Sequence, residues 1–207
     1  MLVALAQSFS PATLIPLHGS IQLANNFSRT LVYSEFFQWK LVKNIVISTM
    51  FGAVIGIYLF GTLPENLLVM VIAATILFLT WAPLDSLILS GMKNDWFCGF
   101  ISGFAGIFVG ANGPLVTAYL RTKNLSPEVL VANHGAIMIF QHGIKIILFA
   151  SFFNFMILDY FIFILILALT GYAGAILGRR LISKVPFKSF NIILKVFLTL
   201  LAFSLFF

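Results

Sequence analysis

Polar and basic side chains recur on two strongly apolar stretches of the sequence. The stretch NHGAIMIFQHGIKIILF, residues 133–149, carries the following groups: Asn133, His134, Gln141, His142 and Lys145. An earlier stretch, LHGSIQLANNFSR, carries a similar set: His18, Gln22, Asn25, Asn26 and Arg29. Imidazole and amide groups donate hydrogen bonds to oxyanions, and cationic side chains also attract them electrostatically. These residue types indicate a binding site for a small anion.

Helical geometry brings the groups of each stretch onto one broad face. The 11 residues from His134 to Lys145 turn an α-helix about 20° beyond three full turns. Gln141 and His142 lie about 20° behind and 80° ahead of His134. In the earlier stretch, the other four polar groups fall within about 80° of His18. We therefore expect two helices, each with a polar stripe that ends in a positive charge.

The composition places these helices in a membrane. Hydrophobic residues make up 61% of the 207-residue chain and charged residues 9%, with a mean hydropathy of +1.08. A soluble protein has roughly 25% charged residues. Seven apolar stretches approach the length of about 20 residues that crosses a bilayer: Pro11–Tyr33, Asn44–Phe60, Leu67–Trp81, Phe97–Leu120, Pro127–Phe149, Ile157–Gly178 and Phe187–Phe207. We expect an all-α polytopic membrane protein with about seven transmembrane helices.

The two cations allow two interpretations. A Lys or Arg at the centre of a membrane helix costs about 2.5–3.5 kcal/mol on insertion scales, so such residues usually face the bundle interior. Arg29 and Lys145 lie close enough to their helix ends to reach the membrane surface as anchors. Their recurrence beside His, Gln and Asn in both stretches favours the binding site.

An internal repeat relates the two stretches. Ser-Pro, His-Gly, a basic residue and Phe-Phe recur at an offset of 116, from Ser10 to Ser126 onward. Ser as N-cap and Pro at the first helical position are typical of a helix start. The second copy also has a Gly-rich segment before its Ser-Pro, which makes four helices per full unit. Because an even number of crossings returns the chain to its starting side, we expect two parallel four-helix repeats.

The repeat divides the chain into four parts. They are a remnant of a first helix at 1–9, an incomplete first repeat at 10–83, a loop at 84–96 and the second repeat at 97–207. The first copy lacks the Gly-rich helix of the second. A longer parent protein, a misassigned start and a member that works without this helix are three explanations that the sequence leaves open.

The Gly-rich segment carries a second signal. Gly99, Gly103 and Gly106 leave a smooth side against which another helix can pack. Asn112, Gly113 and Pro114 make an uninterrupted helix improbable, because Pro removes a donor and clashes one turn back. The start of a half-helix at such a break presents N–H groups to anions. We therefore add Asn112 and Gly113 to the expected substrate-binding residues.

Other features of the composition indicate no further site. The three histidines lack the spacing and the companion ligands of a metal site, so we expect no metal and no cofactor. The basic residues are scattered over short loops and indicate no nucleic-acid partner. No nucleophile–base pair supports an enzyme.

The His-Gly motif with Gln22, Asn26 and Arg29, the broken GFISGFAGIFVGANGPLV helix and the duplicated unit resemble the sulfite exporter TauE/SafE family. The resemblance implies a secondary transporter in the cytoplasmic membrane for sulfite, a sulfonate or another organosulfur anion. The alternative is a non-transporting membrane subunit, or an inactive fragment that needs a partner to complete the bundle. The oligomeric state, a homo-oligomer included, stays open.

The basic residues also predict an orientation. If every span crosses, the face reached after Leu120 carries the larger set: Arg121, Lys123, Arg179, Arg180, Lys184 and Lys188. The opposite face carries Lys40, Lys43 and Lys93. By the positive-inside rule, the first face is cytoplasmic and the C-terminus is outside.

Overall fold

The computed structural model describes residues 8–82, 94–109 and 112–182, together with Leu5, Val196, Thr199 and Leu200. Within these residues all secondary structure is helical, which confirms the all-α prediction. The predicted span Phe187–Phe207, the 84–96 loop and the 1–9 remnant lie mainly outside the described residues.

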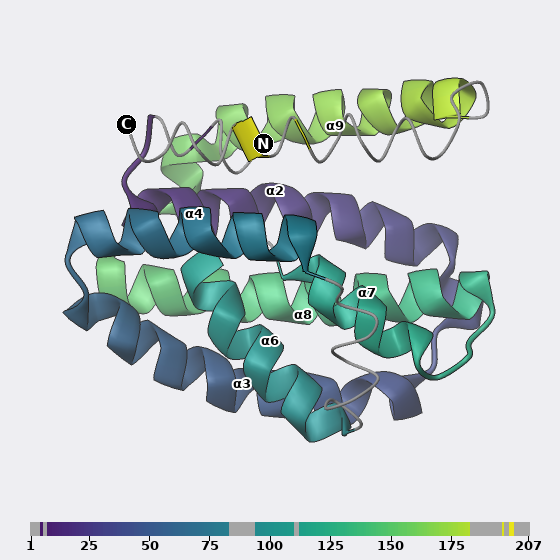
Figure 1. Ribbon diagram of the computed structural model, residues 1–207. Coiled ribbons are helices and arrows are strands. Elements are labelled where there is room, and N and C mark those ends of the chain that lie inside the picture. The colour runs from purple at the N-terminus through teal and green to yellow at the C-terminus, as the bar shows by residue number, and fades with distance from the viewer. Residues whose placement is uncertain are drawn as a thin grey trace.

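The described helices form one bundle whose long axes run broadly along one direction (Figure 1). In chain order they are α2 (Pro11–Val32), the 3₁₀-helix η1 (Ser34–Phe36), α3 (Trp39–Thr62), α4 (Glu65–Trp81), α6 (Asp95–Val109), α7 (Gly113–Arg121), α8 (Pro127–Phe153), the 3₁₀-helix η2 (Ile157–Tyr160) and α9 (Phe161–Ile182). By length and composition, α3 and α8 are the two among them that could cross a membrane. The count of seven spans stays a prediction.

Both predicted Ser-Pro helix starts are confirmed. Ser10 and Ser126 are the N-cap residues of α2 and α8, and a proline lies in the first turn of each helix. The Ser126 hydroxyl accepts a hydrogen bond of 3.4 Å from the backbone N–H of Val129. Ser10 makes no side-chain cap of this kind. The fixed φ of proline therefore accompanies both starts, while the side-chain cap supports only the second.

Helices α6 and α7 form a hairpin. Asp95, at the start of α6, accepts a hydrogen bond of 2.6 Å from the hydroxyl of Tyr119, near the end of α7. Lys123, just beyond α7, forms an ion pair of 2.8 Å with the same carboxylate. Both open ends of the hairpin therefore lie at one end of the bundle. The predicted break is confirmed, but the prediction that Phe97–Leu120 makes one crossing is wrong, because the chain turns back at the break.

Helices α2 and α8 lie side by side and run in opposite directions (Figure 1). A Cβ atom on Gly19, early in α2, would lie 3.4 Å from Cδ of Lys145, late in α8. A Cβ atom on Gly135, early in α8, would collide with the hydroxyl of Thr30, late in α2. The prediction of parallel repeats is therefore wrong for these two helices. Between their starts the chain traverses the bundle along α2, α3 and α4, an odd number, because the hairpin returns to its own side.

One end of the bundle gathers basic and aromatic residues. Asp95 pairs with Lys123 after α7 and also accepts a hydrogen bond from Asn44 in α3, so the start of α3 and the end of α7 are neighbours. The basic residues at this end, called the cationic end below, include Lys40, Lys43, Arg121 and Lys123. The expectation that Lys40 and Lys43 lie opposite the other two is wrong, because it counted the hairpin as a crossing.

The two ends differ in other residues too. Trp39 and Trp96 begin α3 and α6 and Trp81 ends α4, so all three exposed indoles lie at the cationic end. The opposite end carries Glu65 at the start of α4 and Asp159 just before α9. The cationic end also carries Glu35, Asp95 and Glu128, so the two ends differ mainly in their basic residues.

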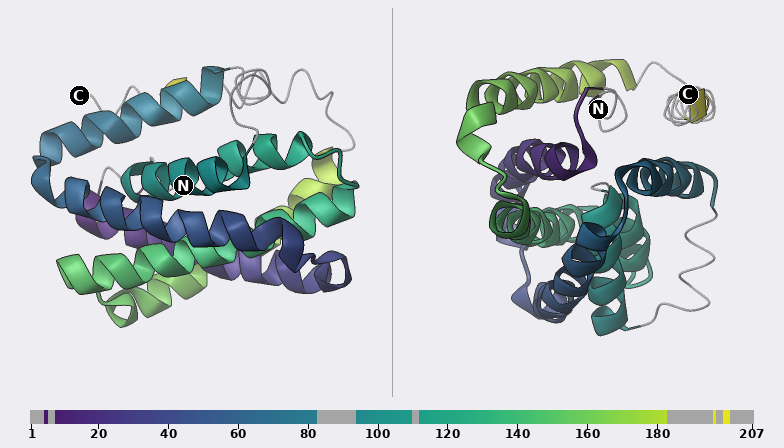
Figure 2. Two further views of the ribbon diagram at one scale, coloured as in Figure 1. Left: turned by 90° about the horizontal axis from the view of Figure 1, so that it is seen from below. Right: turned by 90° about the vertical axis from the view of Figure 1, so that its left-hand side faces the viewer.

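Helices α3 and α6 approach each other backbone to backbone, on the side of the bundle away from α9 (Figure 2). A Cβ atom on Gly103 would collide with the carbonyl of Thr49, and one on Gly52 would collide with the carbonyl of Phe100. The Thr49 hydroxyl donates a hydrogen bond of 3.2 Å to the carbonyl of Gly99. The predicted close-packing role of the α6 glycines is confirmed for Gly99 and Gly103.

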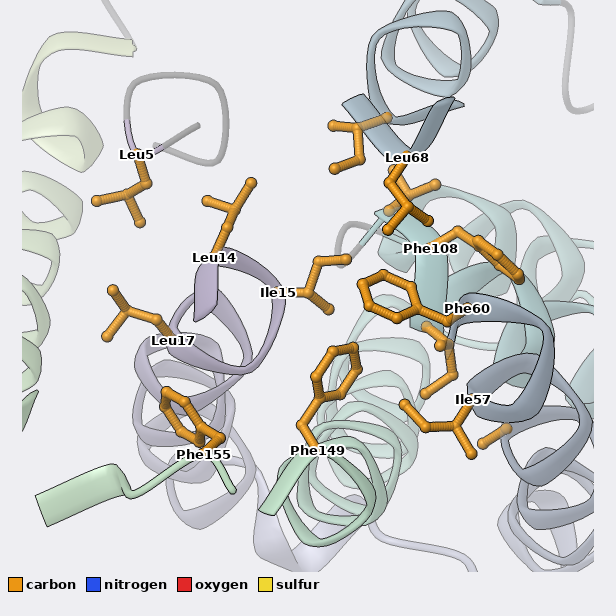
Figure 3. Close-up of a cluster of buried hydrophobic side chains, with 14 of the residues drawn as sticks. Leu5, Leu14, Ile15, Leu17, Ile57, Phe60, Leu68, Phe108, Phe149 and Phe155 are labelled. Carbon is orange, nitrogen blue, oxygen red and sulfur yellow. The ribbon is translucent and has the colours of Figure 1, made fainter. Parts of the chain in front are cut away.

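Apolar side chains fill the bundle near the opposite end (Figure 3). Phe60 of α3 lies 5.0 Å from Phe149 of α8, 5.3 Å from Phe153 and 6.1 Å from Phe108, measured between ring centroids. Ile15 of α2 is fully buried in the same core. We call Phe60, Phe108, Phe149 and Phe153 the phenylalanine cluster. Such tight aromatic packing closes the space between α2, α3 and α8 at this end.

Substituting Gly103 with Ala tests the α3–α6 contact. We expect Gly103→Ala to lower the thermal unfolding midpoint in detergent, because overpacking typically costs about 1–3 kcal/mol. Gly143→Ala is the matched control, since a Cβ atom there meets nothing within 4 Å. Alanine should stabilise that half-buried helical position, by up to about 1 kcal/mol. Equal midpoints for the two variants would contradict the packing described.

Single cysteines test the hairpin. In a Cys98→Ala background, we expect Lys43→Cys and Arg121→Cys to react with a membrane-impermeant maleimide from the same side of a vesicle. Glu65→Cys should react from the other side, because α3 carries the chain to the opposite end. Labelling of Lys43→Cys and Arg121→Cys from different sides would show that the α6–α7 segment crosses.

Candidate functional site

A cavity of about 140 Å³ lies where α2, α7 and α8 meet. It is lined by Gln22, Asn26, Arg29, Gly113, Pro114, His134, Met138 and His142. A water molecule takes about 30 Å³ in the liquid, so the cavity has room for a small ion with some of its water. Six of the predicted binding residues are among the lining residues.

Helix α2 contributes residues from one of its faces. Gln22, Asn26 and Arg29 follow one another at spacings of four and three, which places them along one side of the helix. The amide of Asn26 donates a hydrogen bond of 2.8 Å to the backbone carbonyl of Gln22, which orients this side chain. Asn26 is buried and Arg29 is exposed, so the stripe leads from the interior to the solvent-accessible edge of the bundle.

Helix α8 contributes the facing stripe. His134, Met138 and His142 recur every four residues and therefore share one side of the helix. Nε2 of His134 lies 3.2 Å from the carbonyl oxygen of Gly113, which can only accept, so this nitrogen carries the proton. His142 is buried, and its Nδ1 has no hydrogen-bond partner among the described residues. This nitrogen lies on the side of Gly19.

The start of α7 borders the same cavity. Asn112 is the N-cap residue, and Gly113 and Pro114 begin the helix. The N–H of Gly113 is one of those that helix geometry leaves without an acceptor inside α7, and Pro114 has none. The first turn of a helix carries a partial positive charge and favours anions. The break in the hairpin therefore adds a positive end to the cavity wall.

Two of the predicted binding residues hold the tip of the hairpin in place. The side-chain amide of Gln141 donates hydrogen bonds of 3.0 Å to Thr49 and 2.8 Å to Ser102, and its carbonyl oxygen accepts one from Asn112. Asn112 also donates a hydrogen bond of 2.8 Å to the backbone carbonyl of Ser102. Gln141 and Asn112 therefore join α8, α3 and the hairpin, and neither lines the cavity.

Three further predicted residues lie beside the cavity rather than around it. The rings of His18 and His142 meet edge to face, with centroids 6.3 Å apart. Lys145 is 1% exposed, and its stem packs against Gly19. Asn25 donates a hydrogen bond of 3.4 Å to the side chain of Gln22, on its own helix. His18 and Lys145 thus extend the polar region into the bundle, beyond His142.

The sequence analysis missed two lining residues. Pro114 belonged to the predicted break but was not chosen as a binding residue. Met138 was passed over because it is apolar, although it occupies the position of Gln22 in the second copy, 116 residues later. Applying the repeat offset to every polar position would have found it.

One polar residue of the stretch 133–149 has a structural role away from the cavity. The side chain of Asn133 accepts a hydrogen bond of 2.8 Å from the backbone N–H of Gln38 and donates one of 3.2 Å to the carbonyl of Phe36. Asn133 therefore fixes the turn between α2 and α3 against α8.

The charges around the cavity have one sign. Arg29 is the cation of the lining, none of the eight lining residues is acidic, and α7 adds its positive end. The described residues hold no group of three or more His, Cys, Asp or Glu side chains that could bind a metal ion. The arrangement is suited to a small anion.

A comparison with protein families agrees with this chemistry. The family model of the sulfite exporter TauE/SafE matches residues 1–205 of the chain. No match is found among curated proteins or among solved structures. Because the family match covers nearly all of the 207 residues, the chain belongs to the sulfite exporter TauE/SafE family of membrane transporters, which are not enzymes.

Proposed function

We propose that the chain is a secondary transporter that moves a small oxyanion, such as sulfite or a sulfonate, across the cytoplasmic membrane. The observation that carries the proposal is the cavity of about 140 Å³ that holds a guanidinium group and a helix start but no acidic side chain. In a bundle interior, where screening by water is weak, these positive groups favour an anion over a neutral or cationic solute.

The lining residues make different types of contact with the anion. Arg29 attracts the oxyanion and donates paired hydrogen bonds to two of its oxygens, as guanidinium groups do. The amides of Gln22 and Asn26 and the imidazole of His142 supply further polar contacts. His134 orients the start of α7 through its hydrogen bond to Gly113, so that the helix N–H groups meet the anion.

The charge asymmetry of the bundle supports an orientation. Four basic residues of short connections and helix ends, Lys40, Lys43, Arg121 and Lys123, gather at the cationic end, whereas the described connections and helix ends on the other side contain no Lys or Arg. The positive-inside rule therefore assigns the cationic end to the cytoplasm. Arg29, exposed in the last turn of α2 toward this end, then gives the substrate its entrance from the cytoplasm, as an exporter requires.

Transport of labelled sulfite tests the function. We expect vesicles that contain the protein to transport sulfite, and we expect Arg29→Gln to lower the rate by about tenfold or more, because a hydrogen bond to a charged group contributes about 1.5–3 kcal/mol. Lys43→Gln, which removes an exposed cation outside the cavity, should transport like the wild type. If the wild type moves neither sulfite nor a sulfonate, the non-transporting subunit replaces this proposal.

Labelling in intact cells tests the orientation. With Cys98 replaced by Ala, we expect Glu65→Cys to react with an impermeant maleimide added outside the cell. Lys43→Cys should react only after permeabilisation, because the cationic end faces the cytoplasm. The reverse pattern would place the cavity entrance outside and would contradict an export direction.

A further inference from the structure

The contacts between α2 and α8 are symmetric: replacing each residue by its counterpart in the other copy of the repeat gives the same pairs. A Cβ atom on Gly19 would lie 3.7 Å from Nδ1 of His142 and 3.9 Å from Ile146, and one on Gly135 would meet the carbonyl of Asn26 and the hydroxyl of Thr30. Adding 116 to Gly19 gives Gly135, and subtracting 116 from His142 and Ile146 gives Asn26 and Thr30. Antiparallel helices whose contacts exchange in this way are related by a two-fold axis across the bundle.

This axis maps the cavity onto a second set of residues. Gln22 exchanges with Met138, and Asn26 exchanges with His142, so these four residues are common to both sets. Arg29 and His134, which also line the observed cavity, map onto Lys145 and His18. The two other lining residues, Gly113 and Pro114, have no counterpart at this offset within the sequence. The two sets therefore share a centre and differ in which cation and which histidine flank it, and the start of α7 borders only the observed cavity.

We propose that His18 and Lys145 complete a second binding subsite for the same oxyanion, on the other side of the shared centre formed by Gln22, Asn26, Met138 and His142. This inference rests on the proposed function. The anion passes from Arg29 across the centre to Lys145 on its way from the cationic end to the opposite end.

The burial of the second set shows that it is closed in this structure. Lys145 is 1% exposed and His18 is 3% exposed, whereas Arg29 is exposed to solvent. One turn beyond Lys145, Phe149 belongs to the phenylalanine cluster, which fills the bundle toward the opposite end. The subsite with Arg29 is thus accessible while the subsite with Lys145 is sealed.

The chemistry of the second set suits the same ligand. A lysine ammonium and two imidazoles provide donors for oxyanion oxygens. Helix α2 contains no acidic residue, and α8 contains one, Glu128, in its first turn far from Lys145. Nδ1 of His142, which has no hydrogen-bond partner among the described residues, lies on the side of Gly19 and therefore toward this set. A buried cation in such surroundings attracts an anion as Arg29 does at the entrance.

Binding and transport measured separately test the second subsite. In purified protein, we expect Arg29→Gln to weaken the binding of labelled sulfite by about tenfold or more. Lys145→Met should change this binding by less than about threefold but lower sulfite transport in vesicles by about tenfold or more, because the anion reaches the entrance but not the second subsite. Lys145→Arg should restore most of the transport, since the subsite requires a cation. Lys43→Met is the control for loss of a cation elsewhere.

The outcomes separate this inference from the proposed function. Failure of the wild type to bind and move sulfite would overturn both. Wild-type transport by Lys145→Met, with Arg29→Gln impaired, would overturn the second subsite alone. Equal loss of binding and transport in Lys145→Met would also overturn it, because a single site would then include both cations. If Lys145→Met does not fold, His18→Gln carries the same test with the same expected split between binding and transport.

Discussion

A chain that reverses direction inside an apolar bundle must provide partners for the backbone groups that its helices no longer satisfy. The α6–α7 hairpin meets this constraint with side chains: Asn112 donates to the carbonyl of Ser102, Gln141 holds Asn112, and His134 donates to the carbonyl of Gly113. In a membrane, irregular backbone is tolerated only where protein or a water-filled cavity covers it. The cavity at the start of α7 is therefore a consequence of the reversal as well as a place to bind.

The hairpin also determines how the two copies face each other. Because it enters and leaves at the cationic end, the chain begins α8 from the end at which α2 finishes. Two copies of the His-Gly helix then meet head to tail, and each glycine admits side chains from the late part of the other helix. If the α6–α7 segment crossed the bundle, residues related by the repeat would lie at the same depth on α2 and α8. Arg29 would then lie beside Lys145 rather than on the far side of a shared centre.

Much of this arrangement could be predicted from the sequence, since its signals are local. Ser-Pro starts, the break at Asn112–Pro114 and the smooth glycine side of α6 follow from backbone chemistry and were found. The reversal was missed because an interrupted crossing and a hairpin have the same pattern of Gly, Asn and Pro. Their difference depends on tertiary contacts such as Asp95 with Tyr119, which are 24 residues apart. The predicted symmetry and the predicted sides of Lys40 and Lys43 failed with it.

The candidate site shows a similar limit at the level of single residues. Gln141 and His142 are adjacent in sequence and both polar, yet the side chain of Gln141 is hydrogen-bonded to Thr49, Ser102 and Asn112, while Nδ1 of His142 has no hydrogen-bond partner among the described residues. Successive residues of a helix point about 100° apart, so these two neighbours face different surroundings. The sequence does not show which of them is hydrogen-bonded within the protein and which is left for a ligand. Buried polar groups that are already hydrogen-bonded add rigidity, and those that are not add affinity for a ligand. On α8 the two kinds are neighbours in sequence. Gln141, which fixes the hairpin, therefore also helps to position His142, which lines the cavity.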